Sequence, residues 1–128
     1  MIKVLYGLIV LFFVVLVITK PYISVTESTF NYGELDRNKS NIGEIYITNR
    51  GLLPLRIYDC SGCCGLEANT EKNILKHNER AKVTFDYNSL EVSPGEFNKT
   101  LVIINNDLFH KNKIINITGI VVGEPVLE

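Results

Sequence analysis

The first twenty residues differ from the rest of the chain in their unbroken hydrophobicity. Residues Val4 to Ile18 are almost entirely apolar, and a single lysine lies on either side of them, Lys3 before and Lys20 after. A helix that packs on a globular core carries polar residues on one face at a period of 3.6, and this run has no such face. The pattern therefore predicts a segment that inserts into a membrane.

Two kinds of membrane segment fit, a cleaved secretory signal and an uncleaved anchor. The anchor is favoured because Ile2 to Thr19 is about the minimum length that spans hydrocarbon, and no small-residue cleavage pattern follows it. We expect residues 1–20 to form the anchor or signal, with residues 2–19 in contact with the membrane, and residues 21–128 to form one separate domain. The very short N-terminal tail favours an extracytoplasmic domain on a bacterial cytoplasmic membrane. Cleavage would instead make the domain periplasmic or secreted.

After Pro21 the hydrophobic pattern changes to a period of two, with many β-branched and aromatic residues. Such alternation is typical of half-buried strands, and Gly, Asn and Asp between the runs favour turns. Seven strands are expected: Ile23 to Glu27, Thr29 to Tyr32, Gly43 to Thr48, Leu53 to Tyr58, Ala81 to Tyr87, Phe97 to Ile104 and Lys113 to Val122. Short strands at this spacing predict an all-β, antiparallel two-sheet sandwich.

The alternation also predicts which side chains face the core. Ile45 and Ile47 are expected to point inward, as are the odd-numbered positions of the runs 83–87, 101–104 and 115–121. The stretch from Ser61 to Lys76 shows no strand signal and is expected to be a long loop.

All three cysteines, Cys60, Cys63 and Cys64, lie at the start of this loop, within Asp59-Cys60-Ser61-Gly62-Cys63-Cys64-Gly65. In an oxidising compartment an odd number of cysteines favours one disulfide within the cluster and one free thiol. Two alternatives remain open. One is a thiol redox pair, and the other is a soft-metal site for copper or zinc, with His77 or His110 completing the ligands. The absence of a second Cys-x-x-Cys weakens the zinc alternative.

Charge and motifs exclude several functions. The formal net charge is −1, which gives no electrostatic reason to expect nucleic-acid binding. Acidic residues are scattered without paired spacing, and phosphate-binding loops and nucleophile elbows are missing, so neither an enzyme nor a cofactor is expected. Both histidines are interpreted as surface residues of polar turns. The edge strands of a sandwich can accept a strand from a partner protein.

An ordered series of short motifs resembles a bacterial envelope family. It comprises Phe30-x-Tyr32-Gly33, the run Ile45 to Ile57 with Asn49-Arg50-Gly51-Leu52-Leu53-Pro54-Leu55, the cysteine cluster, Ala81 to Tyr87, Pro94 to Leu101, Asn105-Asn106-Asp107 and Ile117 to Val121. The family is an uncharacterised group of immunoglobulin-like domains with a Ser-Cys-Gly-Cys-Thr loop, related to ASH, hydin, major sperm protein and PapD-type sandwiches. The likeness covers roughly Ile23 to Val122.

The resemblance implies an immunoglobulin-like fold and no particular activity, since fold does not imply function. The chain departs from the family in its third cysteine and wider spacing, and in His77-Asn78-Glu79 where the family has Pro-Gly. We therefore expect a membrane-anchored, extracytoplasmic, non-enzymatic module for protein interaction or envelope assembly. The alternative is a thiol-redox or soft-metal protein that works through Cys60, Cys63 and Cys64.

Overall fold

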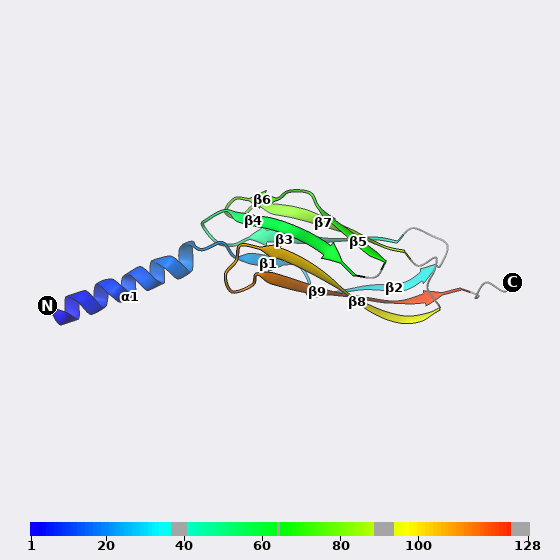
Figure 1. Ribbon diagram of the computed structural model, residues 1–128, viewed down its shortest axis with the longest axis horizontal. Helices are drawn as coiled ribbons and strands as arrows, with labels where there is room; N and C mark the ends of the chain where they lie inside the picture. Colours follow the sequence, from blue (N-terminus) through cyan, green and yellow to red (C-terminus); the bar gives the residue numbers. More distant parts are fainter. Residues whose placement is uncertain (37–40, 64, 89–93, 124–128) are drawn as a thin grey trace.

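The computed structural model describes residues 1–36, 41–63, 65–88 and 94–123, without the side chains of residues 16–18. One helix, α1 (Ile2–Thr19), precedes nine strands. The strands are β1 (Ile23–Val25), β2 (Thr29–Asp36), β3 (Ile42–Asn49), β4 (Leu55–Gly62), β5 (Leu66–Thr70), β6 (Ile74–Leu75), β7 (Arg80–Tyr87), β8 (Gly95–Asn105) and β9 (Asn112–Val122). Figure 1 shows α1 projecting from one end of the packed strands.

The strands form two sheets, as the alternation predicted. One sheet has the order β1-β3-β7-β5 and the other the order β2-β9-β8-β4-β6. Two details of the prediction are wrong: the described part of the chain has nine strands instead of seven, and β2 pairs with β9 in parallel, so the sandwich is not wholly antiparallel.

The core lies between the sheets and consists of the residues that alternation placed there. Ile45 and Ile47 of β3 are buried, as are the odd-numbered positions of 83–87 in β7, 101–103 in β8 and 115–121 in β9. The largest fully buried side chains are Tyr87 and Phe85. Phe85 packs edge-to-face on Phe30, with ring centroids 4.9 Å apart. The inward-facing prediction is therefore confirmed, and burial of these side chains supplies the main stabilisation of the fold.

The two strands that the sequence did not predict, β5 and β6, both lie in the expected loop. The segment Leu66-Glu-Ala-Asn-Thr70 of β5 contains one β-branched residue, and β6 has only two residues. β5 pairs in register with β7 from Leu66↔Tyr87 to Thr70↔Val83. Its strand conformation thus comes from tertiary pairing, which overrides a weak local propensity.

The helix α1 leaves its apolar side chains uncovered. Every side chain from Met1 to Val15 is exposed, including Phe12 at 66% and Phe13 at 60%. No helix among the described residues is long and apolar enough to cross a membrane.

Candidate functional site

Cys60 lies inside strand β4 rather than in a loop, which corrects the sequence prediction. It is half-buried, packs against the core and pairs with Ile103 of β8. Its thiol is free, so the disulfide expected within the cluster does not include Cys60. Cys63 is exposed in the turn after β4, and Cys64 lies outside the described residues.

The surroundings of Cys60 keep its thiol protonated. Burial, with a smaller contribution from the neighbouring Asp59 carboxylate, raises the pKa of Cys60 to about 11. Thiolates, not thiols, attack disulfides and bind metals. Cys60 therefore lacks the low pKa that reactive cysteines have.

His77 lies away from Cys60, beside the other end of β4. Its Nδ1 is 2.8 Å from the carbonyl oxygen of Gly51, which precedes β4, and its Nε2 is 3.1 Å from Nδ2 of Asn78. Within the described residues no three His, Cys, Asp or Glu side chains cluster in a way that could hold a metal. Because Cys64 is outside that part, metal binding by the cluster stays an untested alternative.

Both glycines of the cysteine segment, Gly62 and Gly65, are required by the local backbone geometry. A Cβ on Gly62 would lie 2.7 Å from the side chain of Leu66, and Gly65 has a φ of +92°, which L-residues rarely adopt. Leu66 N donates a hydrogen bond to the carbonyl oxygen of Cys63 at 3.2 Å. The segment is thus a tight turn that carries the chain from β4 in one sheet to β5 in the other.

β5 forms the sheet edge next to this turn. The described sheets have four edge strands, and proteins protect such edges by shortness, bulges or charge. β1 has three residues and β6 has two, whereas β2 carries two carboxylates and a register shift between Asn31 and Glu34. β5 has five residues in regular register and a single charge, Glu67. It is the least protected of the four.

The hydrogen-bond pattern shows which backbone groups of β5 face outward. Beyond the two ends of the strand, Asn88 N donates to Gly65 O at 2.9 Å and Glu71 N donates to Lys82 O at 2.9 Å. In an antiparallel ladder such bonded positions alternate, so the odd-numbered residues of β5 bond to β7. The N–H and C=O groups of Ala68 and Thr70 therefore point away from the sheet, toward the free edge.

Two depressions lie near β5. One of about 270 Å³ lies between β5 and β4, with Cys60, Tyr58 and Asn69 among its lining residues. The other, of about 320 Å³, is lined by residues of β5, β7 and β3, including the exposed Ile42. An added strand points alternate side chains to opposite faces, and the depression between β5 and β4 can accept one of them.

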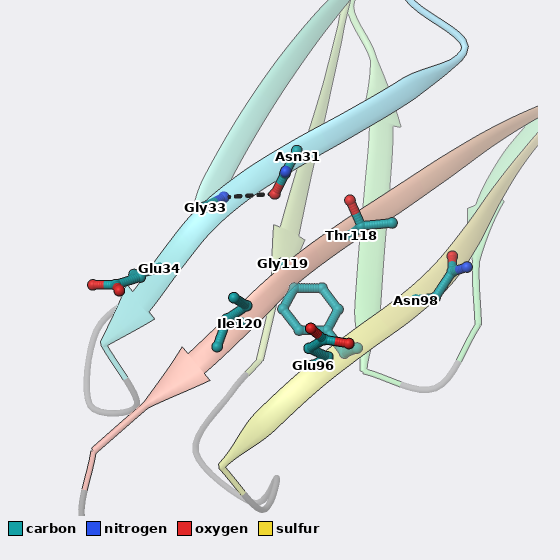
Figure 2. A pocket seen from close by; sticks show the side chains of 9 residues that line it. Asn31, Gly33, Glu34, Glu96, Asn98, Thr118, Gly119 and Ile120 are labelled. Carbon is teal, nitrogen blue, oxygen red and sulfur yellow. Dashed lines mark hydrogen bonds between the residues drawn. The ribbon is translucent and has the colours of Figure 1, made fainter.

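A wider depression of about 590 Å³ lies across β2, β9 and β8 (Figure 2). Gly33, with a φ of +73°, accompanies the register shift of β2, and its N–H donates to Oδ1 of Asn31 at 2.8 Å. A Cβ on Gly119 would lie 2.7 Å from the Phe97 ring, so close packing requires glycine there. Among the described residues, the lining includes two carboxylates, Glu34 and Glu96, and no histidine, cysteine or lysine.

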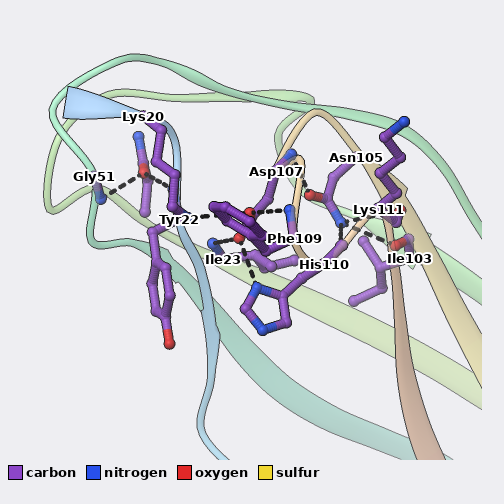
Figure 3. Close-up of polar contacts among 11 residues, drawn as sticks. Lys20, Tyr22, Ile23, Gly51, Ile103, Asn105, Asp107, Phe109, His110 and Lys111 are labelled. Atoms are coloured by element: carbon purple, nitrogen blue, oxygen red, sulfur yellow. Dashed lines mark hydrogen bonds and ion pairs between the residues drawn. The ribbon is translucent and has the colours of Figure 1, made fainter. Parts of the chain in front are cut away.

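A polar cluster that the sequence did not predict joins α1 to the sandwich (Figure 3). At its centre the carboxylate of Asp107 is fully buried. Ile23 N donates to Oδ2 and Phe109 N to Oδ1, both at 3.1 Å. Lys20 Nζ lies 3.3 Å from Oδ1, and Nδ1 of His110 lies 3.1 Å from Oδ2. His110 is therefore part of a structural network, which corrects its interpretation as a surface residue without a role.

The electrostatics of this cluster favour the charged carboxylate. Burial alone would raise the pKa of Asp107, but the hydrogen bonds from Ile23, Phe109, His110 and Lys20 together hold it below its ordinary value of 3.8. The sequence pattern Asn105-Asn106-Asp107 indicated a turn only. The only feature of the sequence that could have indicated this cluster is the Asp107 carboxylate, which lies in a turn between two apolar strands.

Backbone hydrogen bonds fix the end of α1 to the loop between β3 and β4. Leu53 N donates to Thr19 O at 2.7 Å, and Arg50 N donates to Tyr22 O at 2.8 Å. Gly51 is buried against Lys20, and a Cβ there would overlap the Lys20 carbonyl oxygen. The end of the helix is thus attached to the sandwich by specific hydrogen bonds and close packing.

Comparison with known proteins identifies the family of this sandwich. Residues 23–121 match the model of a family described as "Protein of unknown function (DUF1573)". The chain belongs to this family. The predicted resemblance to an uncharacterised family with an immunoglobulin-like fold is confirmed for the DUF1573 region. The chain matches none of the proteins of curated function.

Solved structures share the fold of the DUF1573 region. A protein of unknown function from Porphyromonas gingivalis W83 superposes with a TM-score of 0.72 at 18% identity, over 80% of this chain and 48% of that one. The ASH/PapD-like domain 7 of human CEP192 gives 0.63 at 7% identity, over 83% and 89%. The secreted serine protease VesC from Vibrio cholerae gives 0.55 at 13% identity, over 84% and 24%. The chain thus spans about half of the P. gingivalis protein, and these likenesses show the fold alone.

Proposed function

We propose that the protein is a membrane-anchored, non-enzymatic module that binds an extended segment of another protein along β5, on the extracytoplasmic side of a bacterial membrane. The observation that carries this proposal is the unprotected edge of β5. The outward backbone groups of Ala68 and Thr70 are the donors and acceptors that an added strand requires.

The surroundings of the edge support a strand as the ligand. Main-chain hydrogen bonds supply affinity in strand addition, and pockets for alternate side chains supply specificity. The depression of about 270 Å³ lies along the free edge of β5. It is lined by polar groups such as Asn69 and Thr70, so we expect the bound segment to place a polar side chain there.

The exposure of α1 supports the membrane anchor. Eighteen residues of helix are about 27 Å long, shorter than the hydrocarbon thickness of about 30 Å, so the proposal rests on the exposed apolar surface of α1 and not on its length. Side chains as apolar as Phe12 and Phe13 are exposed, and a bilayer would cover this surface. The outer side is proposed from the resemblance to envelope proteins. Sequencing the N-terminus of the mature protein tests whether residues 1–20 are removed as a signal. If they are, the domain is periplasmic or secreted.

The thiol-redox or metal alternative receives no specific support from the described residues. The raised pKa of Cys60 disfavours a thiolate at neutral pH, and His77 is bonded at the far end of β4. We therefore expect the cysteine segment to have a structural role, as the turn that leads into β5.

Photo-crosslinking tests the binding edge. A photoreactive amino acid at Asn69, which is exposed on β5, is expected to give a discrete protein adduct in membranes of the native host. The same group at Ile114, which is 53% exposed on β9, serves as the control and should give none. An adduct from Ile114 as strong as that from Asn69 would contradict strand addition at β5.

Two substitutions at Ala68 sharpen this test. Ala68→Pro removes the outward N–H while the ladder to β7 keeps its donors, and proline is tolerated at edge positions that face solvent. The adduct from Asn69 should fall several-fold in Ala68→Pro and persist in Ala68→Ser, which retains the N–H. An undiminished adduct in a correctly folded Ala68→Pro protein would show that β5 does not donate to the partner.

A further inference from the structure

We propose that the end of the sandwich next to α1 rests on the same bilayer, with the side chains of two loops and Tyr22 inserted among the lipid headgroups. We call this the junction surface: Tyr22, Leu52, Leu53, Leu108 and Phe109. The inference rests on the proposed insertion of α1 in a membrane. It adds a second contact, made by the folded domain itself.

The junction surface gathers large apolar side chains that stay substantially exposed. Leu108 and Phe109, between β8 and β9, are 69% and 70% exposed, and Leu52 and Leu53, between β3 and β4, are 51% and 52% exposed. Tyr22, between α1 and β1, is 42% exposed. Apolar side chains at neighbouring loop tips typically mark an interaction site.

The junction surface lies close to the end of α1, and this closeness determines how deep it would lie in the bilayer. Leu53 N is 2.7 Å from the carbonyl oxygen of Thr19, the last residue of the helix. Lys20 Nζ lies 4.8 Å from the centre of the Tyr22 ring and 4.9 Å from that of Phe109. When α1 lies in the bilayer, its end reaches the interface, so both loops must be at headgroup level. Tyrosine is enriched at this depth because its ring is apolar and its hydroxyl is polar.

The charges around the junction surface suit a lipid surface. Arg50 and Lys111 are exposed cations in or beside these loops, whereas Lys20 is paired with Asp107. The nearby carboxylates are already paired: Asp107 is buried in its network, and Glu79 lies 3.2 Å from Lys72 Nζ. Cations at the membrane surface are attracted to anionic lipids, each by about 1 kcal/mol.

Single tryptophans report the depth of this surface directly, because the chain has no native tryptophan. The full chain is reconstituted in vesicles of phosphatidylcholine and phosphatidylglycerol with brominated acyl chains, which quench nearby indoles. Phe109→Trp and Leu52→Trp probe the two loops, and Phe12→Trp probes α1. Ile120→Trp, 42% exposed near the last residue of β9, serves as the matched control.

The expected result is blue-shifted, quenched emission for Phe109→Trp, Leu52→Trp and Phe12→Trp, and unquenched emission for Ile120→Trp. Quenching at Phe12→Trp without quenching at either loop would overturn the junction surface and leave the anchor standing. If Phe12→Trp is not quenched, the proposed anchor itself is wrong, and this inference falls with it.

Discussion

Replacing Asp107 with alanine is expected to lower the free energy of unfolding by about 3 kcal/mol. The carboxylate is fully buried and accepts hydrogen bonds from Ile23 N and Phe109 N. Its removal leaves the buried Ile23 N–H without an acceptor and Lys20 without its counter-charge. Urea unfolding of the full chain in detergent, followed by far-ultraviolet circular dichroism, measures the change.

The effect of Asp107→Ala should depend on pH in a defined direction. Because the folded-state pKa of Asp107 lies below its ordinary value of 3.8, the stabilisation is complete above that value and is lost as the pH falls through the folded pKa. The difference from the wild type should therefore be full at pH 7 and shrink in strong acid. Leu108→Ala, at an exposed neighbour, should change stability by less than about 0.5 kcal/mol. Equal stability of Asp107→Ala and wild type at pH 7 would contradict the role of the cluster.

Gly51→Ala is expected to cost about 2 kcal/mol and to loosen the junction between α1 and the sandwich. The new Cβ would overlap the carbonyl oxygen of Lys20, which is backbone and cannot rotate away. The chain must then separate near the hydrogen bond from Leu53 N to Thr19 O. Urea unfolding measures the stability, and hydrogen exchange at the Leu53 amide reports the loosening.

A matched control for Gly51→Ala is Leu52→Ala in the same loop. The Leu52 side chain is 51% exposed, so its truncation should leave both the stability and the exchange at Leu53 nearly unchanged. Slow exchange at Leu53 in Gly51→Ala, equal to that in the wild type, would show that the close approach of Gly51 to Lys20 does not hold the junction.

The strands that carry the core could be predicted from the sequence because their alternation is local. Val83, Phe85 and Tyr87 are all buried on the predicted face of β7, and Leu101 and Ile103 are buried on that of β8. A side-chain period of two is a direct consequence of strand geometry, so each such strand carries its own signal. The family resemblance added the immunoglobulin-like class.

The free edge of β5 could not be predicted from the sequence, because β5 owes its strand conformation to its pairing with β7. β5 has little strand propensity of its own, and its conformation follows from pairing with β7. Cys60 is placed in a strand, beside the groove between β4 and β5, by the pairing of β4 with β8. Sequence spacing drew attention to the three cysteines, whereas the outward backbone of Ala68 and Thr70 follows only from the register.

The polar cluster around Asp107 could not be predicted either, since its members are distant in sequence. Lys20 and Asp107 are 87 residues apart, and Ile23 and Asp107 are 84 apart. Each residue alone fits a common interpretation, a helix-flanking lysine or a turn aspartate. Only the sandwich topology brings β1 beside the β8–β9 loop and makes a buried network of them.

Protease treatment of intact spheroplasts, followed by alkaline carbonate extraction of the membranes, tests the central claim of a membrane-anchored extracytoplasmic module. We predict that added protease digests the sandwich from the outside, and that in untreated samples the full chain stays with the carbonate-washed membranes. A chain that carbonate releases, or a sandwich protected until the cells are lysed, would contradict the account.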